Sequence, residues 1–280
     1  MNCKDDLLLL KAYRSIYMES SQSNMVDDIT NAITKAMNEH GFFGNSSILK
    51  EISNKHRTVS GLDFNNKSSL EYRKWKSETS RQVNNNSNQK YLSRVTGLPF
   101  DLNRAVVSFQ FFPEKTGVFK NNYDLGGFFN PEQDYITFVV NIAASISDES
   151  EFIKELKPVI VHEFIHVRQV YEAKLKNRLI TIPKLSIGGG DKSLELMEKE
   201  FKEYLMHDTE LEAYAVEYNF RHNNNYNRNA IMEFARGVFE KNLGSLTHKD
   251  NTTRQALTSL FERYVEALSD YINRYPYTAN

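Results

Sequence analysis

Two histidines and a glutamate in the middle of the chain have the residue types and spacing of a metal site. The stretch reads VIVHEFIH, with His162, Glu163 and His166 in an HExxH pattern. Residues four apart lie on one face of a helix, so both imidazoles can bind one Zn²⁺ at about 2.0–2.1 Å. Glu163 lies about 100° round the helix from His162, where it misses the metal and can act on a water that the metal activates. The pattern therefore predicts a zinc site with Glu163 as the general base.

Apolar residues surround the pattern and predict that this helix is buried. Ile160, Phe164 and Val167 lie on the face opposite the histidines, while Gln169 falls on the metal side. Buried histidines need hydrogen-bond partners or a metal to offset the loss of water. A single buried histidine is most often a hydrogen-bonded core residue. Two in register, with a glutamate beside the first, favour a metal site.

A catalytic zinc site takes three protein ligands and keeps one position for water, so a third ligand is expected. No later histidine follows in the HExxHxxGxxH arrangement, which leaves a carboxylate from a second helix. Residues 207–217, HDTELEAYAVE, supply Glu210 and Glu212. Glu210 is favoured because Glu212 has a structural explanation: with Thr209 as the N-cap, Glu212 would be the N3 residue of a capping box. Glu212 stays the alternative ligand.

HExxH followed by Glu-x-x-Ala on a later helix resembles the pattern of gluzincin-type zinc metallopeptidases. The second motif occurs as Glu210–Ala213 and again as Glu212–Ala215, and 44 positions (210 − 166) separate His166 from the first. The resemblance covers about 135–220, and the same stretch looks like uncharacterised metallopeptidase-like proteins of phages and bacteria. It implies a zincin-like catalytic core, a Zn²⁺ cofactor and a peptide or protein substrate.

Further residues near the motif have possible roles in such a site. Tyr204 and Tyr214 flank the ligand segment and are candidates for the donor that stabilises the oxyanion, although each could be an ordinary core or surface tyrosine. Glu217 shares the face of Glu210 and is expected to support a ligand or face solvent. Arg168 departs from the family, which prefers an apolar residue there, and the ligands are unaffected.

Two other functions stay open beside a zinc-dependent peptidase. The chain could be a catalytically inactive structural or host-interaction protein, for example phage-encoded, whose zinc site is vestigial or only stabilises the fold. Glu163 argues against this alternative, since a structural site needs no base. Hydrolysis of a non-peptide amide is the other possibility, which the sequence does not separate from peptidase action.

The elements that position these residues predict an α+β fold. We expect helices over 4–20 and 24–41, a Ser/Asn-rich loop, a small antiparallel sheet, and then a mostly helical half that opens near Pro158. The strand patterns are 105–112, 125–129 and 135–142; a loop follows at 182–193, and helical patterns cover 194–206, 209–222, 229–242 and 252–275. We therefore predict a helical N-terminal accessory region (1–95) and a zincin-like metallopeptidase domain (96–280).

The composition of the chain limits the kinds of partner and the cellular location that we expect. The chain has 35 basic and 36 acidic residues, a formal charge of −1, so no nucleic-acid partner is expected. Its single cysteine, Cys3, excludes an intrachain disulfide and fits a reducing compartment. The apolar run Leu7–Leu10 is too short for a signal peptide or a membrane span. A cytoplasmic protein without a membrane partner is expected, and the sequence leaves its oligomeric state open.

Overall fold

A computed structural model describes residues 21–39, 41–44, 91–92, 104–111, 119–131, 135–183, 193–247 and 250–277. They fall into two compact units, an N-terminal unit up to Ile160 and a C-terminal unit from Val161 on. The boundary lies inside helix α5 (Glu149–Leu175), which contributes to both. The predicted helix over 4–20, the predicted loop before the first strand and the predicted domain boundary after residue 95 lie outside the described residues.

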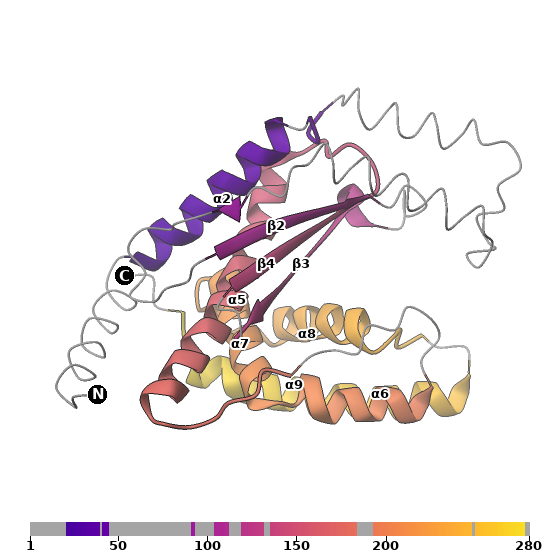
Figure 1. Cartoon of the computed structure of the whole chain (residues 1–280). Helices are drawn as coiled ribbons and strands as arrows, with labels where there is room; N and C mark the ends of the chain where they lie inside the picture. Colours follow the sequence, from indigo (N-terminus) through magenta and orange to yellow (C-terminus); the bar gives the residue numbers. More distant parts are fainter. Residues whose placement is uncertain are drawn as a thin grey trace, which may run out of the picture. The chain divides into compact units, whose positions relative to one another are not determined.

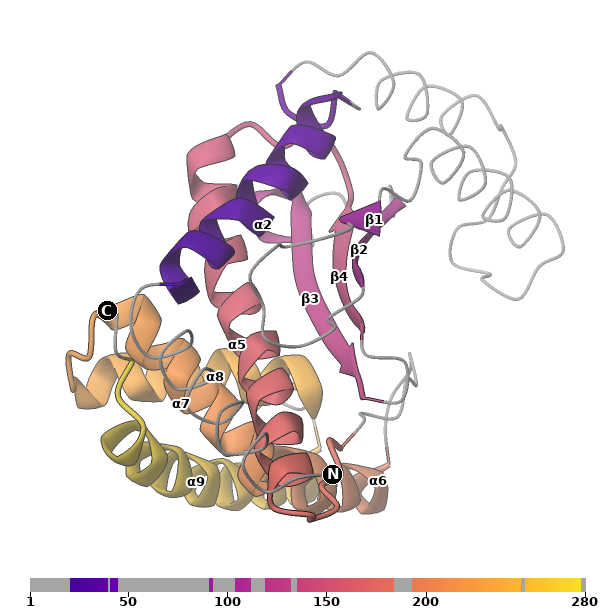
Figure 2. The same ribbon diagram turned by 60° about the vertical axis from the view of Figure 1, so that its left-hand side comes forward.

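The N-terminal unit contains a four-stranded sheet in the order β1-β2-β4-β3. Figure 1 labels β2, β4 and β3, and Figure 2 labels β1 as well. Its strands are β1 (Tyr91–Leu92), β2 (Arg104–Phe111), β3 (Tyr123–Asn130) and β4 (Tyr135–Ile142). Strands β3 and β4 form the predicted antiparallel hairpin. Strand β2, however, pairs with β4 in parallel, so the sheet is mixed and the expected antiparallel sheet is present only in part.

The reason for the mixed sheet is the composition of β4. Ile136, Phe138, Val140 and Ile142 are completely buried, and Thr137 on the other face is buried as well. A strand that is buried on both faces takes a central position, with a partner along each edge. The hairpin partner β3 occupies one edge of β4, and β2 takes the other.

Helix α2 (Ser21–Glu39) confirms the second predicted helix, and Gly41 follows its end with φ at 64°, a value that glycine adopts readily. Figure 2 shows α2 beside the first turns of α5, where Lys157 and Asp27 form an ion pair of 2.7 Å. Just beyond the helix, the Phe42 ring lies 5.2 Å from that of Phe109 in β2. The residues of α2 therefore belong to the same compact unit as the sheet.

Helix α5 carries the HExxH motif and contains a proline in its interior. The sequence places Pro158 in the first turn, but the helix begins nine residues earlier (158 − 149), at Glu149, and continues through the proline. Proline removes one backbone hydrogen bond from a helix interior. Phe152, Leu156 and Ile160 lie at helical spacing and are buried, so packing on both sides of the proline keeps the segments in one helix.

The C-terminal unit is helical, as the sequence predicts. After the last turns of α5 come α6 (Leu194–Glu200), the π-helix η3 (Phe201–Leu205), α7 (Asp208–His222), α8 (Arg228–Asn242) and α9 (Asn251–Arg274). Their apolar faces meet in one core that includes Phe201, Tyr218, Phe239, Tyr264 and Leu268. This core fixes α7 and η3, which supply residues of the candidate site.

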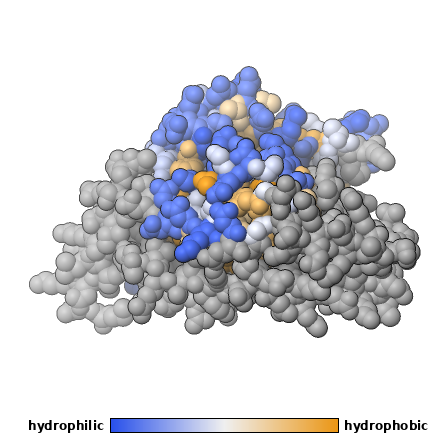
Figure 3. Space-filling model, turned by 90° about the horizontal axis from the view of Figure 1, so that it is seen from above, coloured by the Kyte–Doolittle hydropathy of each residue, from blue (hydrophilic) through white to orange (hydrophobic). Residues whose placement is uncertain are grey.

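No helix among the described residues is long and apolar enough to cross a membrane. On the face drawn in Figure 3, the described residues are mainly hydrophilic, with small hydrophobic patches between them. Among the described residues, the large hydrophobic side chains that are exposed are Phe128, Leu179, Tyr226 and Met232. These four occur singly along the chain, each on a different element or loop.

Candidate metal centre

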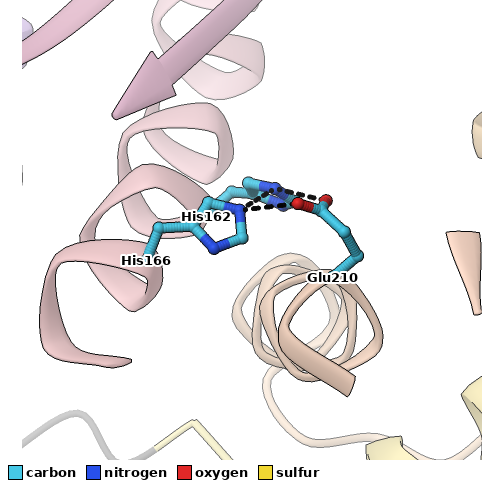
Figure 4. A group of neighbouring side chains, drawn as sticks. All are labelled: His162, His166 and Glu210. Atoms are coloured by element: carbon cyan, nitrogen blue, oxygen red, sulfur yellow. Dashed lines mark hydrogen bonds and ion pairs between the residues drawn. The ribbon is translucent and has the colours of Figure 1, made fainter. Parts of the chain in front are cut away.

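Three predicted ligands meet between α5 and α7 of the C-terminal unit. Figure 4 shows His162 and His166 on α5 and Glu210 in the first turn of α7, with their side chains pointing toward one another. The two Nε2 atoms are 3.2 Å apart; Glu210 Oε1 lies 3.3 Å from His166 Nε2, and Oε2 lies 3.6 Å from His162 Nε2. A tetrahedral ion with bonds of about 2.0–2.1 Å separates its ligands by about 3.3–3.4 Å. The spacing of the donors therefore fits one ion of the size of zinc.

Hydrogen bonds on the far side of each ring fix which nitrogen faces the cluster. Nδ1–H of His162 donates to Glu217 Oε2 at 3.1 Å, and Nδ1–H of His166 donates to Gln169 Oε1 at 3.0 Å. With the protons on Nδ1, both Nε2 atoms present lone pairs to the same point as Glu210. The buried Oε2 of Glu210 has no hydrogen-bond partner among the described residues. Three electron-pair donors converge there, which is the arrangement that a cation satisfies.

The electrostatics of the cluster favour positive charge. Burial alone would lower the pKa of His162, but Glu210 and Glu217 on either side outweigh it and raise that pKa to about 10. For His166 burial also lowers the pKa, and the charge of Glu210 raises it above its ordinary value. Burial raises the pKa of Glu210, but the two histidines outweigh burial and lower that pKa to about 2. Protons and a metal ion therefore compete for the same buried carboxylate and imidazoles.

Glu163, the predicted base, is buried next to His162, and its Oε2 has no hydrogen-bond partner among the described residues. Burial raises its pKa, an effect that the nearby His162 and His166 partly offset. A carboxyl group whose pKa is moved toward neutrality is suited to accept and return a proton near pH 7. The geometry thus keeps one carboxylate oxygen, without a hydrogen-bond partner among the described residues, beside the three converging donors.

The start of α7 differs from the sequence prediction. His207, not Thr209, is the N-cap residue, and its Nδ1 accepts the Thr209 N–H at 3.4 Å. The predicted capping box of Thr209 and Glu212 is therefore wrong. The helix starts earlier because the imidazole of His207 takes the capping role that Thr209 was expected to fill.

Glu212, the alternative ligand, lies outside the cluster. Its carboxylate accepts hydrogen bonds from Arg168 and, at 2.9 Å, from Gln169 Nε2, both on α5. The guanidinium of Arg168 supplies the charge that holds Glu212 in place. The group that could hold a metal consists of His162, His166 and Glu210.

Both predicted tyrosines lie beside the cluster, with their hydroxyl oxygens 3.3 Å apart. Tyr204 comes from the π-helix η3, a form often found at functional sites, and Tyr214 from α7. The Tyr214 ring packs edge-on against that of His162, with 4.5 Å between centroids. Burial raises the pKa of Tyr204 and of Tyr214 well above its ordinary value, so both stay protonated and able to donate.

The supporting residues were only partly visible in the sequence. Glu217 was expected to help a ligand or face solvent; it binds His162, and Arg221 holds its other oxygen through Nε at 3.1 Å and Nη2 at 2.8 Å. The signal for Arg221 is its position four residues after a glutamate on one helix. Gln169 was placed on the metal side, but its bond to His166 was not predicted.

The chain matches no family model, no curated protein and no solved structure. The function is therefore inferred from the donor set, its geometry and the two short motifs.

Proposed function

We propose that the chain is a zinc-dependent hydrolase of the HExxH class that cleaves peptide bonds, with a gluzincin-like ligand set. The observation that carries the proposal is the convergence of His162, His166 and Glu210, all buried, from two helices of one compact unit. Glu163 lies beside them with a carboxylate oxygen that has no hydrogen-bond partner among the described residues.

The donor set suits zinc. Two imidazoles and one carboxylate are a combination that catalytic zinc sites use, with a fourth position kept for water or substrate. The donors are nitrogen and oxygen atoms at distances that fit a tetrahedral ion. Bound Zn²⁺ would polarise the scissile carbonyl and lower the pKa of water to about 7.

The chain's own residues then have distinct roles. Glu163 accepts the proton of the attacking water and delivers it to the leaving amine. Tyr204 and Tyr214, which stay protonated, are the candidate donors to the oxyanion. Glu217 keeps His162 oriented, with Arg221 balancing its charge.

The Oε2 atom of Glu163, which has no hydrogen-bond partner in the described part of the chain, favours an enzyme over a protein that binds metal only for stability. Leaving a buried polar group without a partner costs about 1–3 kcal/mol, and more when the group is charged. A structural site has no use for such a group, whereas a proton acceptor must have a free oxygen. For this reason we propose the hydrolase as the function and keep a catalytically inactive structural protein as the second candidate.

The first experiment is the metal content of the purified protein, measured by elemental mass spectrometry, together with hydrolysis of a panel of quenched fluorescent peptides. We expect about one zinc per chain, lost in His162→Ala and in Glu210→Ala. Glu163→Gln should keep the zinc and reduce turnover by about 10²–10⁴-fold, because only the proton acceptor is removed.

Glu151→Gln is the matched control, since Glu151 is a partly exposed glutamate near the start of the same helix whose ion pair is with Lys154. It should retain both zinc and turnover. If Glu163→Gln hydrolyses the peptides as fast as the unmodified protein, or if no variant loses zinc, the proposed mechanism is wrong.

A further inference from the structure

Gln169 uses both polar atoms of its side-chain amide in contacts around the metal centre. Its Oε1 accepts the Nδ1–H of His166 at 3.0 Å. Its Nε2 donates to the backbone carbonyl of Thr209 at 3.0 Å and to Glu212 Oε2 at 2.9 Å. The side chain is buried, so these protein groups take the place of water.

The partners determine which way the amide points. Thr209 O and the Glu212 carboxylate can only accept, so the NH₂ group of Gln169 must face them and its oxygen must face His166. That oxygen needs a donor, which only a proton on Nδ1 can supply. The Nε2 of His166 is thereby left as a lone-pair donor toward Glu210 and His162.

The same amide also reaches the helix that carries the third ligand. Thr209 directly precedes Glu210 in the first turn of α7, and Glu212 lies two positions beyond it. Arg168, the neighbour of Gln169, binds Glu212 as well. The HExxH helix is therefore attached to α7 at the turn from which Glu210 projects.

The side-chain amide of Gln169 can accept a hydrogen bond from His166 and also donate hydrogen bonds to α7, whereas a carboxylate could only accept. At His162 the partner is the carboxylate of Glu217, whose charge is balanced by two hydrogen bonds from Arg221. At residue 169 a carboxylate would still accept from His166, but it would face the Thr209 carbonyl and Glu212 with no hydrogen to donate. Like-charge repulsion with Glu212 would add to that loss.

We propose that Gln169 is a positioning residue of the metal centre, which holds His166 in its metal-binding tautomer and sets the position of Glu210 relative to the histidines. The inference rests on the proposed function in one respect, that the three donors bind a metal. It does not depend on what the enzyme hydrolyses. Supporting hydrogen bonds of this kind typically change metal affinity by about 10–100-fold.

The test uses Zn²⁺ affinity of the full chain, measured by competition with a chromophoric chelator. Gln169→Leu removes both functions of the amide and should weaken Zn²⁺ binding about 10–100-fold. Gln169→Glu keeps the acceptor for His166 but loses the donor to α7, so we expect an intermediate loss. Adding Glu212→Gln to Gln169→Glu exchanges donor and acceptor between the two positions and should recover part of the affinity, whereas Glu212→Gln alone should not raise it.

Two further readouts separate positioning from packing. In the zinc-loaded protein, long-range ¹H–¹⁵N spectra should show His166 bound through Nε2 in the unmodified chain and in Gln169→Glu, and a mixture of ring nitrogens in Gln169→Leu. The Tm of the metal-free protein measures packing, and the added stability from Zn²⁺ measures the site. Glu151→Gln, near the start of the same helix, is the control expected to match the unmodified protein in the spectrum, the metal-free Tm and the stabilisation by Zn²⁺.

The outcomes are distinct from those that test the proposed function. If the unmodified chain binds no Zn²⁺, both proposals fail. If it binds Zn²⁺ and Gln169→Leu binds equally tightly with an unchanged His166 spectrum, only the role of Gln169 is overturned. If Gln169→Leu lowers the metal-free Tm and leaves affinity and spectrum unchanged, its role is packing and the positioning role is likewise overturned.

Discussion

At the scale of single residues, the candidate centre is divided between paired and unpaired polar atoms. The Nδ1 atoms of His162 and His166 have protein partners. The Oε2 atoms of Glu163 and Glu210 are buried and have none among the described residues. Unpaired buried oxygens are costly in an ordinary core. They are the only two carboxylate oxygens of this kind among the described residues, and they lie together, as the proposed metal ligand and the proposed base require.

Tyr204, one of the two tyrosines beside the cluster, gives a prediction at the scale of single residues. Tyr204→Phe should lower kcat by about 10²–10³-fold, because it removes one donor to the oxyanion and leaves the ligands in place. Zinc content, measured on the same preparation, should stay at the level of the unmodified protein. An unchanged kcat would show that the Tyr204 hydroxyl serves only to bond Tyr214.

At the scale of helices and strands, local pattern predicted most of the described fold. The spacing of apolar residues located the helices of the C-terminal unit, whose observed bounds lie close to the predicted ones. The hairpin of β3 and β4 was also local, since a turn joins two adjacent strand patterns. The parallel pairing of β2 with β4 was missed because it joins strands 31 positions apart (135 − 104), and no local pattern in β2 reveals its partner.

The candidate site was predictable to the same extent. The HExxH ligands follow from helix geometry alone, because four residues make about one turn. The choice between Glu210 and Glu212 depended on contacts across 43 or 44 positions, from Gln169 and Arg168 to Glu212. The expected capping box favoured Glu210, which does lie in the cluster, but for a wrong reason, since Glu212 is engaged by α5 and not by its own helix.

A prediction at this scale concerns how α7 is held. The buried Asn219 donates through Nδ2 to the carbonyls of Ile272 at 2.8 Å and Tyr275 at 2.9 Å, at the end of α9. Asn219→Ala leaves these carbonyls without that donor and should reduce the free energy of unfolding by about 2–3 kcal/mol. The shift in the midpoint of urea unfolding measures this change in stability.

Asn219→Asp is the sharper version, because the carboxylate has nearly the same shape and cannot donate; it should destabilise at least as much at pH 7. The exposed Asn229 provides the control, since Asn229→Ala should change stability by less than about 0.5 kcal/mol. Equal stability of the Asn219 variants and this control would contradict a role for Asn219 in joining α7 to α9.

At the scale of the whole molecule, pH should act on the metal-free and metal-loaded protein in opposite directions. The pKa of His162 is raised from 6.5 to about 10. In the metal-free protein, the contribution of His162 to the free energy of unfolding is therefore complete below pH 6.5 and is lost as pH rises toward 10. The pKa of Glu210 is lowered from 4.5 to about 2, so its contribution is present above pH 4.5 and is lost as pH falls toward 2. Without metal, the two contributions are complete together between pH 4.5 and 6.5.

Zinc requires the same histidine without its proton on Nε2, so the stabilisation by Zn²⁺ should increase as pH rises above 6.5. Each displaced proton changes the free energy of binding by about 1.4 kcal/mol per pH unit. We expect the difference in Tm between zinc-loaded and chelator-treated protein to be larger at pH 8 than at pH 6.5. A difference that is the same at both pH values would mean that zinc displaces no proton.

The distance in sequence between the two histidines and the groups that complete their site has a consequence for how the protein is made. At about 5–20 residues per second, Glu210 is synthesised roughly 2–9 s after His166, and the Ile272 carbonyl that holds α7 follows later still. During that interval two neighbouring imidazoles are present without their carboxylate. Nitrogen ligands of this kind bind Cu²⁺ more tightly than Zn²⁺. For the proposed metal centre, the ions available to the nascent chain would therefore influence which metal binds first, before α9 packs against α7.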